Sequence, residues 1–138
     1  MLDSVEFFAT SIVNDSLFSK LASLQYSSTG TRRICLHQNE ESPLHIMLVQ
    51  AAHGNKFPRH FHNDSDEVTV VLRGRLKIDL WVTGIHNPPT THLLDPTTSS
   101  QVCFLSKGCP HVTEPLTSDV IYLEVKLGPF SKEALVLC

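Results

Sequence analysis

The stretch from Gly54 to Gly74, GNKFPRHFHNDSDEVTVVLRG, constrains the fold of this chain more than any other part of the sequence. His60 and His62 lie two residues apart in a run rich in Val and Thr, which favour strands. Alternate side chains of a strand point to one face, so both imidazoles can approach a single point. The turn formers NDSD then reverse the chain, and Glu67 opens the next strand beside the histidines. The stretch therefore predicts a strand pair that carries two imidazoles and a carboxylate.

This set of side chains is typical of a metal site. Nitrogen ligands with one carboxylate suit a divalent transition metal such as Zn, Fe, Mn, Ni or Cu, whereas Ca and Mg prefer shells made only of oxygen. The alternative interpretation is a chance clustering of polar side chains on a hairpin, which the spacing and a further histidine downstream disfavour.

The spacing of five residues in this stretch resembles the first signature motif of the cupin superfamily. That motif reads Gly, five residues, His-x-His, four residues, Glu, six residues, Gly. Each of its positions is matched here, by Gly54, His60, His62, Glu67 and Gly74.

The second cupin motif, P-x-G-x-x-H-x-x-x-N, is matched in part. Gly108 and His111 keep their places, while Ser106 stands where the motif has Pro and Pro115 stands where it has Asn. The resemblance implies that His111 is a fourth protein ligand, in a shell of three histidines and Glu67. Four ligands in an octahedral shell would leave two positions for water, substrate or O2.

A narrower resemblance extends over nearly the whole chain. The segments RRICLH at 32–37, VVLRGRL at 70–76 and EVKLGPF at 124–130 are similar to the WbuC-type cupin metalloproteins. These proteins are often associated with bacterial surface-polysaccharide gene clusters. The resemblance implies one divalent transition metal, Fe, Mn, Zn or Ni, and a role in polysaccharide metabolism.

Length and composition limit the remaining possibilities. A chain of 138 residues is the size of one domain, with 41% hydrophobic residues and 18% charged ones. The net charge of −3 offers no basic surface for nucleic acid. No apolar run approaches the ~20 residues of a membrane-spanning helix, and the sequence MLDSVEFFAT lacks the features of a signal peptide. We expect a cytoplasmic protein that binds neither nucleic acid nor membrane.

The pattern divides the chain into residues 1–42, an N-terminal strand and helix segment packed on a barrel, and residues 43–138, the barrel itself. The apolar stretch Val5–Val13 has no clean period and is compatible with an edge strand. Leu17, Leu21 and Leu24 recur at helical spacing after the N-capping candidates at 14 and 15, so 16–25 is predicted as a short amphipathic helix.

From Pro43 onward the sequence consists of short strands separated by turn residues, which predicts an all-β sandwich or barrel. Together with the cupin resemblance, this gives a double-stranded β-helix, a small jelly-roll barrel. In 75–82 and 119–127 apolar and polar residues alternate, which predicts one buried and one wetter face for each strand. The buried face of the first strand would carry Leu76, Ile78, Leu80 and Val82. The wetter faces would carry Arg75, Lys77, Asp79 and Trp81 in the first strand and Tyr122, Glu124 and Lys126 in the second. Residues 83–91, with two prolines, form a loop. Alternation also points Pro58, Thr69 and Val71 toward the cavity.

The other histidines have simpler interpretations. His45 is interpreted as a hydrogen-bonded residue of an apolar strand, His86 and His92 as solvated, and His53 as a residue at a strand end. The four cysteines show no C-x-x-C spacing and are expected as reduced thiols. Cys109 lies two residues before His111, near the mouth of the expected site, where it could meet a substrate.

Five residues are candidates for substrate contacts. An exposed arginine pair is usually only a solvated surface, but the resemblance suggests that Arg32 or Arg33, with His37, folds over the barrel mouth and binds an anionic group through the planar guanidinium. Arg59 and Cys109 are the further candidates at the rim. The expected partner is therefore a small molecule, with an anionic sugar derivative as the leading candidate.

Three functions from different classes remain open at this stage. The first is a metal-dependent isomerase or epimerase acting on a sugar or sugar-nucleotide, with an ionisable group that moves a proton. The second is an iron-dependent dioxygenase. The third is a sugar-binding or regulatory module without turnover, which the lack of an obvious general base favours. A homodimer is compatible with all three.

Overall fold

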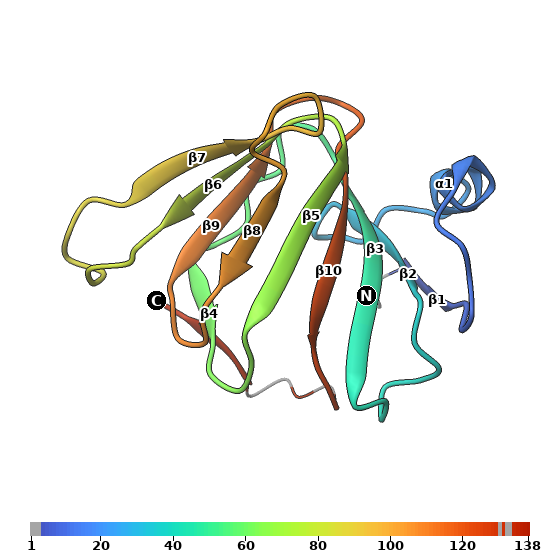
Figure 1. Cartoon of the computed structure of the whole chain (residues 1–138), viewed down its shortest axis with the longest axis horizontal. Helices are drawn as coiled ribbons and strands as arrows, with labels where there is room; N and C mark the ends of the chain where they lie inside the picture. The colour runs from blue at the N-terminus through green and yellow to red at the C-terminus, as the bar shows by residue number, and fades with distance from the viewer. Residues whose placement is uncertain (1–3, 130, 132–133) are drawn as a thin grey trace.

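The computed structural model describes residues 4–129, 131 and 134–138. One helix and eleven strands form within these residues (Figure 1). Their bounds are β1 Ser4–Phe7, α1 Asp15–Ala22, β2 Thr31–Cys35, β3 Leu44–Ala51, β4 His60–His62, β5 Glu67–Arg73, β6 Leu76–Leu80, β7 Thr90–Leu94, β8 Val102–Leu105, β9 His111–Pro115, β10 Ile121–Leu127 and β11 Leu135–Leu137.

The strands form two sheets. The first has the order β1-β2-β3-β10-β5-β8, and the second has the order β11-β4-β9-β6-β7. All pairs are antiparallel except β1 with β2, which are parallel. Strands far apart in sequence are neighbours, as where β10 lies between β3 and β5. The predicted all-β jelly roll with a short N-terminal helix is confirmed.

The main core lies between the two sheets. Its buried side chains come from both, with Val49 and Val71 from the six-stranded sheet and Leu76 and Ile78 from the five-stranded sheet, all at most 1% exposed. Within each of these strands the core residues lie on the one face that points toward the other sheet.

A second, smaller core lies on the outer face of the six-stranded sheet, under α1. The helix stands beside β2 and β3 (Figure 1) and buries Leu17 and Leu21 against Ile34 and Leu48. Asn14 caps the helix, since its side-chain oxygen accepts a hydrogen bond from the Leu17 N–H at 3.1 Å. The predicted helix is confirmed, although it ends at residue 22 instead of 25.

The N-terminal segment contributes strands as well as the helix. The apolar stretch proposed as an edge strand forms the edge strand β1 only over its first part, and residues 8–14 connect it to α1. Strand β2 continues the six-stranded sheet through its pairing with β3. No helix in the described part of the chain is both long and apolar enough to span a bilayer.

Two strand predictions need correction. Strand β6 ends at Leu80, and Val82 is 62% exposed in the loop that follows, because that loop begins before the two prolines. In β10 the face that carries the polar residues was predicted to face solvent, but it points into the interior of the barrel. Tyr122, Glu124 and Lys126 line a cavity between the sheets, while the apolar positions of the strand face outward.

Candidate metal centre and cavity

Three histidines converge inside the barrel from two neighbouring strands. His60 and His62 occupy alternate positions of β4, and His111 is the first residue of β9, where it is paired with His60. Their ring centroids lie 4.4 to 5.5 Å apart. One ring nitrogen of each comes within 4.8 Å of those of the other two, close enough to share one ion.

Backbone carbonyls orient two of these rings. The Nδ1 atom of His60 donates to the Pro58 carbonyl at 2.9 Å, and that of His111 donates to the Cys109 carbonyl at 3.0 Å. A histidine that donates through Nδ1 presents the lone pair of Nε2, which is the usual arrangement of a metal ligand.

Glu67 approaches the histidines from the other sheet. It is the first residue of β5 and is 5% exposed, and its Oε2 lies 2.9 Å from Nε2 of His62. The sequence predicted a strand pair at this point, but β4 and β5 belong to different sheets. The turn between them therefore crosses the gap between the sheets and is held there by a hydrogen bond from the Leu127 N–H to Ser65 Oγ at 2.9 Å.

Burial favours the neutral form of two of the imidazoles. Burial lowers the pKa of His111 to about 4 and also lowers the pKa of His60. Burial opposes ionisation of Glu67, but the hydrogen bond from His62 and nearby positive charge outweigh it and lower its pKa. At neutral pH His60 and His111 are therefore neutral imidazoles and Glu67 is a carboxylate, which are the protonation states that a divalent transition metal requires.

One glycine of the degraded second motif shapes the turn before β9. Gly108 has φ +83°, in the left-handed region that glycine tolerates, and its N–H donates to the His62 carbonyl at 2.7 Å. The contact ties this turn to β4. The turn thus survives the replacement of the motif's Pro and Asn, and His111 stays beside the other two histidines.

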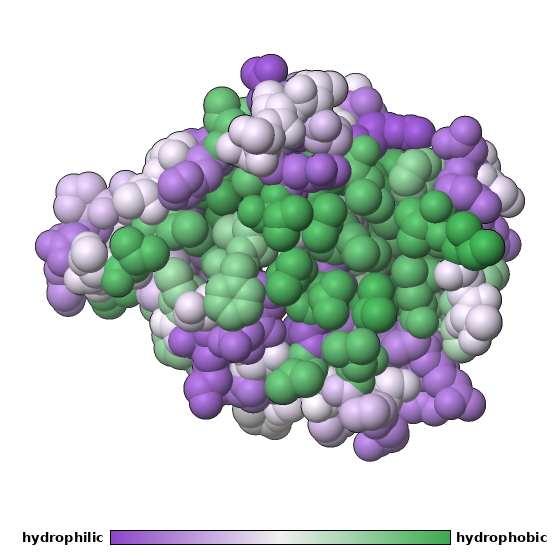
Figure 2. All heavy atoms as spheres, in the orientation of Figure 1, coloured by the Kyte–Doolittle hydropathy of each residue, from purple (hydrophilic) through white to green (hydrophobic). Residues whose placement is uncertain are grey.

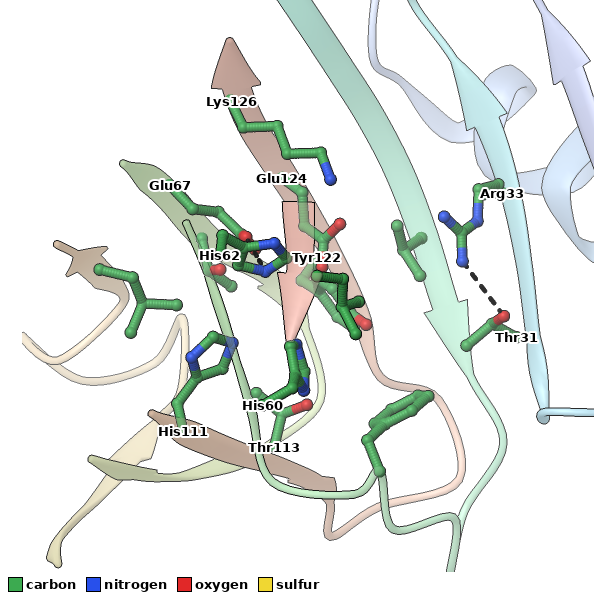
Figure 3. Close-up of a pocket in the computed structure, with 15 residues that line it drawn as sticks. Thr31, Arg33, His60, His62, Glu67, His111, Thr113, Tyr122, Glu124 and Lys126 are labelled. Carbon is green, nitrogen blue, oxygen red and sulfur yellow. Dashed lines mark hydrogen bonds and ion pairs between the residues drawn. The ribbon is translucent and has the colours of Figure 1, made fainter. Parts of the chain in front are cut away.

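A cavity of about 170 Å³ opens beside the cluster. Its opposite wall is charged, and Figure 3 shows Glu124 and Lys126 of β10 facing the histidines, with Arg33 of β2 farther along the wall. Thr31, Thr69, Thr113 and Tyr122 add side-chain hydroxyl groups to the lining. Of the three residues predicted to face the cavity, Thr69 lines it, Val71 belongs to the core and Pro58 is exposed.

Glu124 is one of the cavity residues that sequence reasoning missed, and it is the one whose pKa is shifted toward neutrality. Burial, followed by the negative charge of Glu67, raises its pKa to about 7, although Arg33 and Lys126 pull it back toward ionisation. A carboxyl group with such a pKa can both accept and donate a proton near neutral pH. The sequence contained one indication of this role: Glu124 alternates with apolar residues in β10, so it lies in the cavity if the polar face of the strand points inward.

The two arginines of the predicted clamp point to opposite faces of β2. Arg33 lines the cavity, with its guanidinium 3.5 Å from Thr31 Oγ1. Arg32 lies at the end of α1, where it donates to the Ala22 and Leu24 carbonyls at 2.9 and 2.8 Å and packs on an aromatic ring. Only Arg33 of this pair is placed to meet a ligand in the cavity.

The other predicted contacts lie away from the cavity lining. His37 is buried between Phe7 and His45, with its ring stacked on that of His45 at 4.0 Å. Arg59 stacks over Trp81 and donates to the Cys138 carbonyl at 3.2 Å. The structure therefore places these residues in packing contacts.

Cys109 also has a structural contact. Its Sγ lies 3.6 Å from the Pro110 carbonyl, and burial raises the pKa of the thiol, so the reactive thiolate is disfavoured. All four cysteines are free, as predicted. His45 is buried and hydrogen-bonded to the Glu40 carbonyl, whereas the remaining histidines outside the cluster, His53, His86 and His92, are exposed.

No protein-family model and no curated protein sequence matches this chain. Solved structures do match it. KdgF from a Halomonas species aligns with a TM-score of 0.61 and 16% identity over 79% of this chain and 89% of its own. Oxalate decarboxylase from Lactobacillus farciminis aligns with a TM-score of 0.56 and 16% identity over 70% of this chain. Both are cupin-fold proteins. The chain has the cupin fold.

The matched structures differ in how much of their own length aligns with this chain. This chain spans only 27% of the oxalate decarboxylase. A candidate sugar phosphate isomerase from Acidithiobacillus ferrooxidans aligns with a TM-score of 0.51 and 16% identity over 63% of this chain and 51% of its own. At these identities the comparisons establish the fold. The three-histidine cluster itself supports a bound metal ion of undetermined identity.

Proposed function

We propose that this cupin is a metal-dependent enzyme that acts on a small sugar derivative by isomerisation or epimerisation, in the surface-polysaccharide metabolism that its resemblance to WbuC-type cupins implies. The observation that carries the proposal is the position of Glu124, which faces the three-histidine cluster across the cavity. This carboxyl group supplies the proton-transfer function that the sequence did not reveal.

The residues that would hold the metal are His60, His62, His111 and Glu67. Their donor set fits a divalent transition ion, because the Nε2 atoms of two imidazoles are presented by carbonyl-anchored rings and the carboxylate is ionised. When bound, such an ion would polarise a carbonyl or a pair of hydroxyl groups on the substrate.

The remaining cavity residues fit a small polar substrate. Glu124 is placed to take a proton from a carbon next to a carbonyl and to return it, since its pKa of about 7 suits both steps. Arg33 and Lys126 are the cations of the lining and would bind a carboxylate or phosphate. A volume of about 170 Å³ is below the ~300 Å³ of ordinary ligand pockets, so a monosaccharide derivative fits the cavity better than a nucleotide-sugar.

Solvent-exchange NMR tests the proposal. The metal-loaded protein is incubated in D2O with a panel of neutral, carboxylated and phosphorylated monosaccharides. Isomerisation or epimerisation through proton transfer incorporates deuterium at the carbon that loses its proton, and we expect this signal from at least one sugar. Glu124→Gln should abolish incorporation while metal content stays at the parental level, whereas His111→Ala should lose both.

The same panel separates the two other functions. Oxygen consumption with an iron-loaded sample and no deuterium incorporation would indicate a dioxygenase. Saturable binding without either signal would indicate a sugar-binding module. Deuterium incorporation that persists in Glu124→Gln would refute the role assigned to this residue.

A further inference from the structure

Two buried side chains of the cavity wall end in hydroxyl groups that meet the cavity instead of a protein partner. Tyr122 of β10 is 5% exposed, Thr69 of β5 is 3% exposed, and both line the cavity. Within residues 4–129, 131 and 134–138, neither side-chain hydroxyl makes a hydrogen bond. By contrast, the buried hydroxyl of Thr31 is bonded to Ser27 Oγ at 3.2 Å. Because buried hydroxyl groups are normally hydrogen-bonded, Tyr122 and Thr69 are placed to serve a molecule in the cavity.

The two hydroxyl-bearing residues are both neighbours of Glu124. Tyr122 lies two residues before Glu124 in β10, so their side chains share one face, and Figure 3 shows both in the cavity wall. Thr69 is the direct cross-strand partner of Glu124. Direct partners have Cβ atoms about 5 Å apart, and diagonal neighbours such as Thr69 and Tyr122 are about 7 to 8 Å apart. A ligand that contacts Glu124 therefore meets the two hydroxyl groups at different atoms.

The usual polarity of a half-exposed sheet is inverted at these strands. Antiparallel sheets with one solvated face place apolar residues inward and polar ones outward. Figure 2 shows hydrophobic side chains over the outer surface of β5, β8 and β10, and Val102 and Phe104 of β8 are exposed. The polar side chains Thr69, Tyr122 and Glu124 point into the cavity instead. Packing of the core does not require polar groups there, whereas binding of a polar ligand does.

The chemistry of the two hydroxyl groups suits the oxygen atoms of a sugar. The ring of Tyr122 belongs to the main core, which fixes the direction of its hydroxyl group. Burial, followed by the charge of Glu124, raises the pKa of the Tyr122 phenol well above its usual range, so the phenol stays protonated and can donate a hydrogen bond. The Thr69 hydroxyl can donate or accept. Both groups can pair with a hydroxyl or carbonyl oxygen, and neither can pair with a methylene group.

We propose that Tyr122 and Thr69 bind two different oxygen atoms of the substrate, on either side of the carbon that faces Glu124, and thereby select a fully hydroxylated sugar against a deoxy sugar. The inference rests on the proposed function, because it takes Glu124 as the group that meets the reacting carbon. A site built to pair with a substrate hydroxyl group rejects the analogue that lacks it, since the buried group of the protein is then left unmatched. The substrate class is therefore a monosaccharide derivative that carries oxygen on both carbons next to the reacting one.

Isothermal titration calorimetry of the metal-loaded protein measures this selection. Hexoses, hexuronic acids and hexose phosphates are each compared with their monodeoxy forms. The parent protein should bind at least one of these sugars at least about ten-fold more tightly than two of its monodeoxy forms. Tyr122→Phe should reduce the difference for one deoxy form to within about two-fold, and Thr69→Val should do so for the other, because the partner of the deleted hydroxyl group is already gone.

The other tyrosine of the chain provides the matched control. Tyr26 is 37% exposed and packs against the Arg32 guanidinium, outside the cavity. Tyr26→Phe removes the same atom as Tyr122→Phe and should keep the parental discrimination against both deoxy forms.

Two further readouts distinguish ligand binding from a structural role. The free energy of unfolding of metal-free Tyr122→Phe and Thr69→Val should be no lower than that of the parent, because neither change removes a hydrogen bond within the described part of the chain. In the parent protein, the NMR signal of the Tyr122 phenol carbon Cζ should shift when the sugar binds. The corresponding signal of Tyr26 should not, and the chain has only these two tyrosines.

The outcomes separate this inference from the proposed function. Parental discrimination in both cavity variants would overturn the inference, even if deuterium incorporation showed isomerisation or epimerisation. Loss of stability in both variants without a change in sugar binding would overturn it as well. Discrimination that the two substitutions remove, without deuterium incorporation into any sugar, would support the two binding residues and refute the proposed reaction. A panel in which no sugar binds the parent would overturn both.

Discussion

Replacing Glu124 by Gln should stabilise the metal-free protein, and more so at high pH. Glu124 lies in the cavity wall, where burial followed by the charge of Glu67 raises its pKa from 4.5 to about 7. A carboxyl group with a raised pKa contributes stability that is fully present below pH 4.5 and is lost as the pH rises through about 7. Glutamine keeps a similar shape and carries no charge at any pH.

The size of the effect follows from the two pKa values. One pH unit between them corresponds to about 1.4 kcal/mol. At pH 8 the ionised carboxylate therefore costs the folded state about 2 to 3 kcal/mol, allowing for its partial contact with solvent, while at pH 5 the cost is below about 1 kcal/mol.

Urea unfolding of chelator-treated protein at both pH values measures this difference. The free energy of unfolding of Glu124→Gln should exceed that of the parent by about 2 to 3 kcal/mol at pH 8 and by less than about 1 kcal/mol at pH 5. Glu41→Gln removes an exposed carboxylate and should change neither value. If Glu124→Gln were no more stable than the parent at pH 8, the carboxyl group would not be held in an unfavourable site, and its proposed proton-transfer role would lose its physical basis.

Two further predictions concern the metal cluster and the arginine pair. His60→Ala and His111→Ala should each lower metal occupancy at least about ten-fold, with His92→Ala unchanged, as measured by elemental analysis of dialysed protein; equal loss in all three would place the metal elsewhere. Arg32→Ala should lower the free energy of unfolding by about 2 kcal/mol, because it removes two hydrogen bonds at the end of α1 and a ring contact. Arg33→Ala should instead weaken binding of anionic sugars, measured by calorimetry. If Arg32→Ala weakened sugar binding and Arg33→Ala lowered stability, the two faces of β2 would be exchanged.

The histidine motif and the helix were accessible from the sequence because they depend on local spacing. Alternation in β4 is sufficient to place His60 and His62 on one face, and the interval to Glu67 fits a short turn. That the turn crosses from one sheet to the other depends on the closure of the barrel, which no local pattern encodes.

The polarity of β10 shows a limit of pattern reasoning. Alternation identifies two faces but does not say which one is inside, and hydrophobicity normally decides. Here the cavity requires Glu124 and Lys126 inside, and α1 covers Ile121 on the outside. The assumption that the apolar face of β10 points inward therefore gave the wrong orientation for this strand, and the charged wall of the site was not predicted.

The arginine pair shows a similar limit. The sequence identified a basic pair ahead of the barrel, but it did not show that residues 31–35 form a strand of the sheet. Once they do, neighbouring arginines must point to opposite faces. Arg33 then lines the cavity, and Arg32 is left to anchor the helix.

The metal content of protein purified without added metal or chelating resin tests the central claim most directly. Elemental analysis should find close to one transition-metal ion for each chain, and the same preparation of His111→Ala should contain almost none. A parent protein that carries no transition metal and takes up none from Fe, Mn, Ni or Zn salts would contradict the account, because the converging imidazoles would then have no ion to hold.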